Sequence, residues 1–223
     1  MIRCIDVCKT YRQGGSEITA LAGVSLDISA GAFAVIMGPS GSGKSTVLHL
    51  IGGLDRPSSG DVLVEGRLIG QMPDAQVTLF RRRRIGFVFQ FFNLLPTLSA
   101  LENIALPLVL DGQPRTEAVE RAMSLLAKVG LENRRDHLPE QLSGGEIQRV
   151  AVARALAFNP PIVLADEPTG NLDSKNGEAI LELLQQINRQ DGSTVVMVTH
   201  SQEAAERGTQ RILLRDGKVE AQS

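Results

Sequence analysis

The sequence predicts an α/β fold whose core of alternating strands and helices carries an inserted helical lobe. Three observations support this prediction. Strand and helix patterns alternate at both ends of the chain, and a stretch with purely helical spacing lies between them. In addition, a glycine-rich segment at 38–45 joins an apolar strand pattern to a helical one, as is typical of α/β cores. The chain shows no internal repeat and no low-complexity tract.

The N-terminal part of the chain is predicted to form mainly strands. The expected strands cover 2–11, 21–28, 32–37, 62–64 and 85–89, and the expected helix covers 44–52. Turn residues at 13–16 separate the first two strands, and the run at 32–37 is apolar throughout. A continuous apolar run is typical of a strand buried on both faces, so 32–37 is expected at the centre of the sheet.

From residue 99 the apolar residues recur at spacings of three and four, which indicates helices. The expected helices cover 99–110, 115–129 and 144–157. The strand pattern then returns at 161–165 and 194–199, on either side of an amphipathic helix at 175–189. The remaining elements are a short helix from Gln202 and small strands at 211–215 and 218–220.

Composition limits the classes of function. Hydrophobic residues make up 43% of the 223 residues, and the formal net charge is −2. This balance is that of a globular domain and gives no sign of nucleic-acid or anionic-membrane binding. No apolar run approaches the roughly 18 residues of a membrane-spanning helix, and 1–10 lack the pattern of a secretory signal. We therefore expect a cytoplasmic protein that reaches a membrane only through a partner.

The two cysteines, Cys4 and Cys8, lie on one predicted strand. Residues four apart on a strand point to the same face but are too distant for a disulfide bond. A metal site would need more ligands nearby than the sequence offers. We expect two small side chains that are buried or half-buried.

A phosphate-binding motif is present at Gly38-Pro39-Ser40-Gly41-Ser42-Gly43-Lys44-Ser45, which fits G-x-x-x-x-G-K-[ST]. Glycines let backbone N–H groups wrap around phosphate oxygens, and the following helix directs its positive end at them. Lys44 would neutralise the β- and γ-phosphates, and Ser45 would offer its hydroxyl to Mg²⁺. The motif predicts a nucleoside triphosphate, without separating kinases, GTPases, helicases and transport ATPases.

Two carboxylates, Asp166 and Glu167, follow the apolar run at 162–165. In a chain with a phosphate-binding loop, Asp166 has the position of a carboxylate that acts on Mg²⁺. Glu167 comes next, at the strand end, where it could polarise an attacking water. The alternative is a pair of acidic residues that are simply solvated. The apolar strand before them argues against this alternative.

The stretch Leu142-Ser143-Gly144-Gly145-Glu146 opens a predicted helix. An N-cap hydroxyl, closely approaching glycines and a helix dipole would together form a second phosphate-type site. One chain cannot easily direct two such sites at one γ-phosphate, whereas two chains that face head to tail can. The pattern predicts a dimer in which each copy completes the other's site. An ordinary capped helix is the alternative.

With these motifs, the whole chain resembles the ATP-binding subunits of the ABC transporter family. The stretch 142–146 is similar to the family signature, and Asn171-Leu172-Asp173 is similar to the loop that crosses the dimer interface. Gln90 matches the glutamine that touches Mg²⁺ and the attacking water, and His200 matches the histidine that contacts the γ-phosphate. Tyr11 matches the aromatic residue that stacks on adenine. A structural hydrogen bond for His200 and simple packing for Tyr11 are the alternatives.

The resemblance implies a P-loop, RecA-like ATPase core at 1–90 and 160–223, with a small antiparallel β subdomain and an inserted helical subdomain at 91–159. It implies ATP hydrolysis, with ATP and Mg²⁺ bound. The implied catalytic residues are Glu167, His200 and Gln90, and the implied metal ligands are Ser45, Gln90 and Asp166. The implied nucleotide contacts are Tyr11, Gly38, Pro39, Ser40, Gly41, Ser42, Gly43, Lys44, Ser45, Thr46, Ser143, Gly144, Gly145 and Asp173.

Three stretches, 52–57, 85–96 and 165–173, carry a finer resemblance to the lipoprotein-release and macrolide-export group. That group implies a separate integral membrane permease as partner, at the cytoplasmic face of the inner membrane. The cargo would be a lipoprotein, a peptide or a macrolide-type compound. Cell-division ATPases look similar, so a mechanotransmission complex that transports nothing is the alternative. Departures from the family pattern at Ile147, Ser201 and Ala32 leave the partner and cargo open.

Two further segments have open interpretations. The loop at 91–96 contains five apolar residues, which are costly to expose. It could form a groove for a short permease helix, or it could pack between the two lobes. The basic run Arg81–Arg84 precedes a predicted strand, and we expect a solvated turn there. Contact with lipid headgroups or a partner is the alternative.

Overall fold

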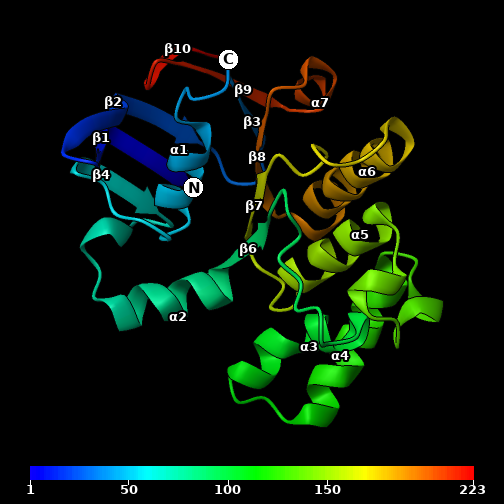
Figure 1. Ribbon diagram of the computed structural model, residues 1–223. Helices are drawn as coiled ribbons and strands as arrows, with labels where there is room; N and C mark the ends of the chain where they lie inside the picture. The colour runs from blue at the N-terminus through cyan, green and yellow to red at the C-terminus, as the bar shows by residue number, and fades with distance from the viewer.

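A six-stranded sheet in the order β10-β9-β3-β8-β7-β6 forms the centre of the molecule (Figure 1). The computed structural model describes residues 1–223, with the exception of the Gln13 side chain. Neighbouring strands run parallel, except for the antiparallel β9–β10 pair. The strands are β3 (Phe33–Met37), β6 (Ile85–Val88), β7 (Ile162–Asp166), β8 (Thr194–Thr199), β9 (Gln210–Arg215) and β10 (Lys218–Gln222).

A second, antiparallel sheet in the order β2-β1-β4-β5 lies beside the first. Its strands are β1 (Ile2–Gln13), β2 (Ser16–Ile28), β4 (Ser59–Val64) and β5 (Arg67–Leu68). Strand β2 begins five residues earlier than the apolar pattern indicates. The pattern missed these residues because most of them, next to the turn, are exposed in the structure. The predicted α/β class, with a small antiparallel part, is confirmed.

Seven α-helices accompany these sheets. They are α1 (Lys44–Ile51), α2 (Asp74–Arg84), α3 (Ala100–Leu110), α4 (Arg115–Lys128), α5 (Gly144–Ala155), α6 (Ser174–Asp191) and α7 (Gln202–Glu206). Of these, α3 and α4 pack on α5 rather than directly on a strand. Short 3₁₀ helices cover Ile69–Gln71, Glu132–Arg134 and Pro139–Gln141. Within the described part of the chain, none of the helices has the length and apolar character needed to cross a membrane.

The strands of the parallel sheet separate two hydrophobic cores. On β8, Val195 and Met197 belong to the core shared with α3, α4, α5 and α6. Their neighbours Val196 and Val198 belong to the core shared with α1 and the antiparallel sheet. Side chains alternate between the faces of a strand, so a strand that is buried on both faces reads as a continuous apolar run. Figure 1 shows the two layers on opposite sides of β3, β8 and β7.

Helix α2 was not predicted, and the expected solvated turn at Arg81–Arg84 is wrong. These arginines form the last turn of α2, where basic side chains interact favourably with the helix dipole. Arg82 and Arg83 both form ion pairs with Asp111, and Arg84 pairs with Glu65. Only Val77 and Phe80 of α2 are buried, so the helix has too few apolar positions to show a helical period.

The two cysteines are free, as predicted. Cys4 is buried and Cys8 is half-buried. Burial raises the pKa of the Cys4 thiol to about 12. A thiol with so high a pKa is a small apolar core residue rather than a nucleophile.

Candidate functional site

The parallel strands β3, β6, β7 and β8 end at one edge of the sheet. Their pairing places Met37 beside Thr199, Asp166 beside Val198, and Val88 beside Ala165. The loops that leave this edge contain four of the predicted sites: the glycine-rich loop, Gln90, Glu167 and His200. In α/β sheets, ligands bind outside the carboxyl ends of the strands, so the topology brings these groups to a common position.

The loop between β3 and α1 leaves room only for glycine at two positions. A Cβ on Gly38 would lie 2.0 Å from the Leu214 carbonyl oxygen, and one on Gly43 would lie 2.6 Å from the Ala20 carbonyl oxygen. Gly43 is the N-cap of α1 with φ 97°, a conformation that disfavours other residues. No side chain caps α1 in the described structure, so its first N–H groups are available to an anion.

Lys44 lies inside this loop and is only 6% exposed. Its Nζ donates to the carbonyl oxygens of Gly38 at 3.0 Å and Pro39 at 2.9 Å. The Ser42 hydroxyl nearby is buried and has no hydrogen-bond partner among the described residues. A buried ammonium, an unpaired hydroxyl and a free helix N-terminus are the groups that a chain of phosphates would satisfy, so the residues fit a nucleotide.

Ser45 and Asp166 come from two different elements and meet directly. Ser45 Oγ donates to Asp166 Oδ1 at 2.9 Å, and His49 Nε2 lies 3.9 Å from Asp166 Oδ2. Burial raises the pKa of the Asp166 carboxyl, against the opposing influence of Ser45, His49 and Lys44. A cation at this position would compensate the buried carboxylate.

The donor set suits magnesium in particular. Among the described residues, no three His, Cys, Asp or Glu side chains form a group that could hold a metal. Mg²⁺ is usually bound by one or two carboxylates together with phosphate oxygens and water, rather than by an all-protein cage. One hydroxyl and one carboxylate beside a phosphate loop therefore fit Mg²⁺.

Glu167 and His200 form a second pair at the same edge. Glu167 Oε2 lies 2.6 Å from His200 Nδ1, and the Glu167 N–H donates to Val198 O at 3.0 Å. Glu167 has φ 46°, an uncommon conformation for a residue other than glycine. Such conformations concentrate at functional sites, where neighbouring contacts hold them. Here the contacts direct the carboxylate toward the end of β8.

Gln90 and Asn171 are joined through their loops. Asn171 Nδ2 donates to the Gln90 carbonyl oxygen at 2.9 Å. The Gln90 side-chain amide lies close to Gly170, where an added Cβ would be 3.0 Å from Nε2. The loops after β6 and β7 therefore support each other beside Glu167.

Sequence reasoning missed Gln148. Its side chain is fully buried in α5, and its Nε2 donates to the Pro168 carbonyl oxygen at 2.7 Å. It thereby ties α5 to the loop that follows Glu167. A signal was available, because Gln148 lies three residues after Gly145 and four before Val152, on the buried face of the helix.

Tyr11 lies beside helix α1. Its hydroxyl donates to Asp55 Oδ2 at 3.0 Å, and Lys9 Nζ lies 4.9 Å from its ring centroid. Burial and the contact with Asp55 raise the pKa of the Tyr11 hydroxyl, while the side chain of Thr46 lowers it. The influence of Thr46 on this pKa indicates that the Tyr11 hydroxyl lies near the start of α1, and the residue is 38% exposed.

Ser143 caps helix α5. Its hydroxyl accepts from the Glu146 N–H at 3.3 Å, and its own N–H donates to Glu146 Oε2 at 2.8 Å. These hydrogen bonds from Ser143, with help from Arg134, lower the pKa of Glu146 to about 2. A Cβ on Gly145 would lie 2.3 Å from Asn176 Oδ1, so the start of α5 packs closely on the start of α6.

Asp173 caps α6 at the same surface. Its Oδ1 accepts from the Asn176 N–H at 2.9 Å, and its Oδ2 accepts from Asn176 Nδ2 at 2.7 Å. The structure thus groups Ser143, Gly145 and Asp173 around two neighbouring helix starts. Helix α5 belongs to the core on the face of the sheet opposite α1, so the two groups are carried by different layers of the fold.

Two cavities adjoin these groups. One, of about 230 Å³, is lined by residues that include Glu167, Gly170, Asp173 and His200. The other, of about 340 Å³, lies beside the loop after Gln90, with Phe87, Phe89, Asn93, Pro107, Arg154 and Phe158 in its walls. Of the apolar loop residues, Phe91 is 73% exposed, whereas Leu94 packs against the helical core.

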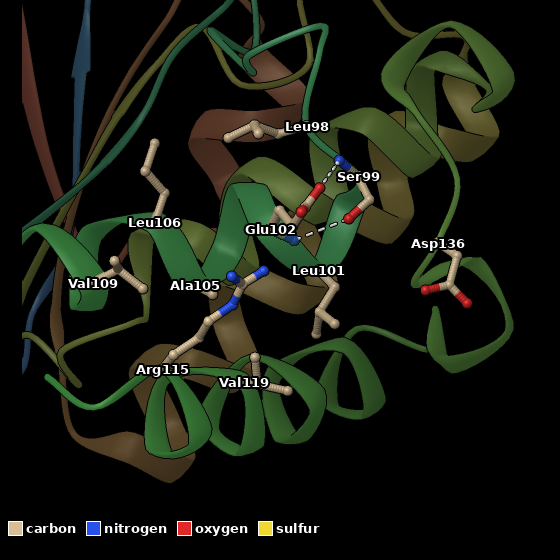
Figure 2. Close-up of a pocket in the computed structure, with 10 residues that line it drawn as sticks. All are labelled: Leu98, Ser99, Leu101, Glu102, Ala105, Leu106, Val109, Arg115, Val119 and Asp136. Atoms are coloured by element: carbon tan, nitrogen blue, oxygen red, sulfur yellow. Dashed lines mark hydrogen bonds between the residues drawn. The ribbon is translucent and has the colours of Figure 1, made fainter.

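A third cavity, of about 460 Å³, lies between α3 and α4 and contains none of the predicted site residues. Figure 2 shows Leu98, Leu101 and Val119 around it. The dashed lines in Figure 2 mark the hydrogen bonds between Ser99 and Glu102 that cap α3.

Comparison with known proteins gives consistent matches. Residues 21–170 match the sequence profile of the ABC transporter family. A protein of Thermotoga maritima, described as an uncharacterized ABC transporter ATP-binding protein, is 51% identical over 220 residues, which cover 99% of this chain and 94% of that protein. The uncharacterized ABC transporter ATP-binding protein MJ0796 of Methanocaldococcus jannaschii is 52% identical over 227 residues, which cover 99% of this chain and 95% of that protein.

Two solved structures of MJ0796 have the same fold as this chain. A dimer in a post-hydrolysis state, bound to ADP and Pi, has a TM-score of 0.93 at 49% identity and covers 100% of this chain and 98% of that one. A second dimeric structure has a TM-score of 0.93 at 50% identity, with the same coverage.

Proposed function

The chain belongs to the ABC transporter family, and we propose that it hydrolyses ATP as a dimer of two identical copies to drive a separate membrane permease. The chain is the ATP-hydrolysing subunit. One observation carries the assignment of residues: Lys44, the Ser45–Asp166 pair and the Glu167–His200 pair lie at the same edge of one sheet. This edge combines groups for binding phosphate, for holding a cation and for accepting a proton.

In the proposed reaction, a water attacks the γ-phosphorus, the bond to the β-phosphate oxygen breaks, and ADP leaves. Glu167 orients the water and accepts its proton, while His200 holds the Glu167 carboxylate in place. Lys44 exchanges its carbonyl partners for phosphate oxygens. Mg²⁺, when bound by Ser45 and Asp166, would neutralise the charge that develops on the phosphates. Gln90 would contact the metal and the water.

The nucleotide contacts are proposed to come from two copies of the chain. One copy supplies Tyr11 for the adenine and the segment Gly38–Thr46 for the phosphates. The other supplies the group at the starts of α5 and α6, with Ser143, Gly145 and Asp173 facing the same ATP. The two groups are carried by helices on opposite faces of the sheet, which supports a head-to-tail arrangement.

The permease is proposed to bind beside the loop that follows Gln90. The cavity of about 340 Å³ there has aromatic walls, and Phe91 is 73% exposed. Exposed apolar surface of this kind marks interaction sites. Segment 91–159 would move as a helical subdomain against a core formed by 1–90 and 160–223.

The membrane partner would hold the chain at the cytoplasmic face of the inner membrane. The resemblance of 52–57, 85–96 and 165–173 to the lipoprotein-release and macrolide-export group supports export or extraction as the output. The cargo would be a lipoprotein, a peptide or a macrolide-type molecule.

The Glu167→Gln variant tests the proposal. Glutamine keeps the size of the side chain but cannot accept the proton, so kcat should fall at least about 100-fold while ATP still binds. Phosphate release measures turnover, and a fluorescent ATP analogue measures binding. Glu132→Gln, at an exposed position that lines none of the three cavities described above, is the matched control. Near-normal hydrolysis by Glu167→Gln would refute the role of Glu167.

A further inference from the structure

The loop that follows Gln90 has an unusual backbone. Phe92 and Asn93 both have positive φ angles, 61° and 52°. This region is uncommon for residues other than glycine, and a bulky residue such as Phe stays there only where surrounding groups hold it. The conformation of this loop is therefore set partly by contacts from elsewhere in the fold.

Arg154 supplies such contacts to both residues. Its Nη2 donates to the Phe92 carbonyl oxygen at 2.8 Å, and its Nη1 donates to the Asn93 carbonyl oxygen. Both acceptors are backbone groups, and no carboxylate among the described side chains forms an ion pair with Arg154. The planar guanidinium has its donors in a fixed fork, so it holds two consecutive carbonyls in one relative orientation.

Arg154 lies at the opposite end of its helix from Ser143, so the contacts of Arg154 connect the loop to Ser143. Arg154 lies in the last turn of α5, whereas Ser143 is the N-cap of the same helix. Residues Val150–Ala153 of α5 are fully buried, so this part of the helix is packed firmly against its neighbours. Helix α5 is about 18 Å long, at 1.5 Å per residue, and joins Arg154 to Ser143 through one unbroken helix.

Arg154 also lines the 340 Å³ cavity beside this loop, together with Asn93 and three aromatic side chains. The same guanidinium therefore faces the proposed permease groove and holds the loop after Gln90. A shift of this loop would displace the end of α5, and a shift of α5 would displace the loop.

We propose that Arg154 is a positioning residue that makes the placement of the Gln90 loop and of Ser143 depend on each other. It does not touch ATP; it acts through the two carbonyls of the loop and through α5. The inference rests on the proposed function, because it concerns ATP turnover by a closed dimer.

The test compares two arginines that make the same kind of contact. Arg121 of α4 donates to Leu156 O at 3.1 Å and Ala157 O at 3.2 Å, two consecutive carbonyls just beyond the end of α5. It stabilises the helix end without touching the loop, so Arg121→Lys and Arg121→Gln are matched controls for Arg154→Lys and Arg154→Gln. Each variant is made in the full chain.

A single tryptophan can report on the loop, because the natural chain has none. Phe91→Trp places it at a position that is 73% exposed and directly before Phe92. The signal is the change in emission when ATP and Mg²⁺ are added, measured in this background with each arginine variant. Thermal unfolding, the KM for ATP and kcat are measured in parallel.

We expect the Arg154 variants to keep KM within about twofold and to lose at least about tenfold in kcat, because small displacements of reacting groups are costly. The ATP-dependent emission change should disappear as well. The Arg121 variants should lose a similar amount of Tm but keep both kcat and the emission change. If Arg154→Gln does not fold, Arg154→Lys, which keeps the charge but lacks the fork, carries the test.

Unchanged kcat in the Arg154 variants, or an equal loss of kcat in the Arg121 variants, would overturn the inference and leave Arg154 as a structural contact. If the unmodified chain does not hydrolyse ATP, the proposed function itself is contradicted. The two failures are therefore separable.

Discussion

At the scale of single residues, the Asp166 carboxylate is suited to binding a cation, but its buried charge lowers the stability of the fold. Its side chain is 16% exposed, and burial raises its pKa above the usual range. A raised pKa means that the folded protein holds the proton more tightly than the unfolded chain does. The contribution of Asp166 to stability is therefore best at low pH and is lost as pH rises from the usual pKa through the raised one.

Asp166→Asn should therefore be at least as stable as the unmodified protein at pH 7 without nucleotide and magnesium. The amide removes the buried charge and can still accept the hydrogen bond from Ser45 Oγ. The difference in Tm should shrink toward pH 4, and Mg²⁺-dependent ATP hydrolysis should fall at least about 100-fold. Differential scanning fluorimetry at several pH values and a phosphate-release assay measure the two effects.

The exposed carboxylate of Asp136 provides the control, since Asp136→Asn should change neither quantity. A lower Tm for Asp166→Asn at pH 7 would contradict the prediction, because it would mean that the charged carboxylate stabilises the fold.

Residues at the edge where β3, β6, β7 and β8 end differ in how well the sequence could predict their place in the site. The glycine-rich loop, Asp166 and Glu167 follow apolar runs, and parallel strands bring such strand ends to one edge, so their grouping could be predicted. The helical spacing could mark Gln148 as a buried residue, but neither its partner nor that of Arg154 could be found in this way, because both partners are backbone carbonyls distant in sequence. A carbonyl has no sequence signature, so only the fold reveals these contacts.

At the scale of elements, α3 and α5 begin with the same local structure. Each starts with a serine N-cap and a glutamate three residues later, in a capping box: Ser99 with Glu102, and Ser143 with Glu146. The hydroxyls accept from the glutamate N–H groups at 3.2 Å and 3.3 Å. Comparing substitutions of the two serines therefore distinguishes the structural role of an N-cap from a role in binding phosphate.

Ser99→Ala and Ser143→Ala should each lower the free energy of unfolding by about 1 kcal/mol, the usual effect of losing an N-cap. Only Ser143→Ala should also lower kcat/KM for ATP, by at least about tenfold, because the proposed hydrogen bond to a charged phosphate would be lost. Urea unfolding and steady-state hydrolysis give the two numbers. Equal activity in both variants would leave Ser143 as a cap only.

The elements themselves were predictable in proportion to how deeply they are buried. Strands β3, β7 and β8 are buried along almost their full length and appear in the sequence as continuous apolar runs. Helix α2 exposes most of its surface and is fixed by ion pairs of Arg82, Arg83 and Arg84 instead. Pairing between charges far apart in the chain leaves no periodic pattern.

At the scale of the whole molecule, the proposed head-to-tail sharing of ATP between two copies predicts an ATP-dependent dimer. The Glu167→Gln variant should elute at the 24.0 kDa of one chain without nucleotide, and at twice that mass with ATP and Mg²⁺. Blocked hydrolysis should retain the ATP that the two copies are proposed to share. Size-exclusion chromatography with light scattering measures the mass.

Two controls accompany this experiment. Chelation of Mg²⁺ should restore the monomer, and combining Ser143→Ala with Glu167→Gln should weaken the dimer because one of its proposed contacts to ATP would be missing. A monomeric Glu167→Gln protein under all conditions would contradict the head-to-tail arrangement.

The division of β8 between two cores also matters for protein engineering. Val195 and Met197 face the helical layer, while Val196 and Val198 face the layer of α1 and the antiparallel sheet. Substitutions in the two sets share no partners within a core, but adjacent residues of one strand remain coupled through the backbone. A combinatorial library on this strand can therefore be split into an odd and an even set for the first screen, and the merged variants then measure the coupling between the two cores.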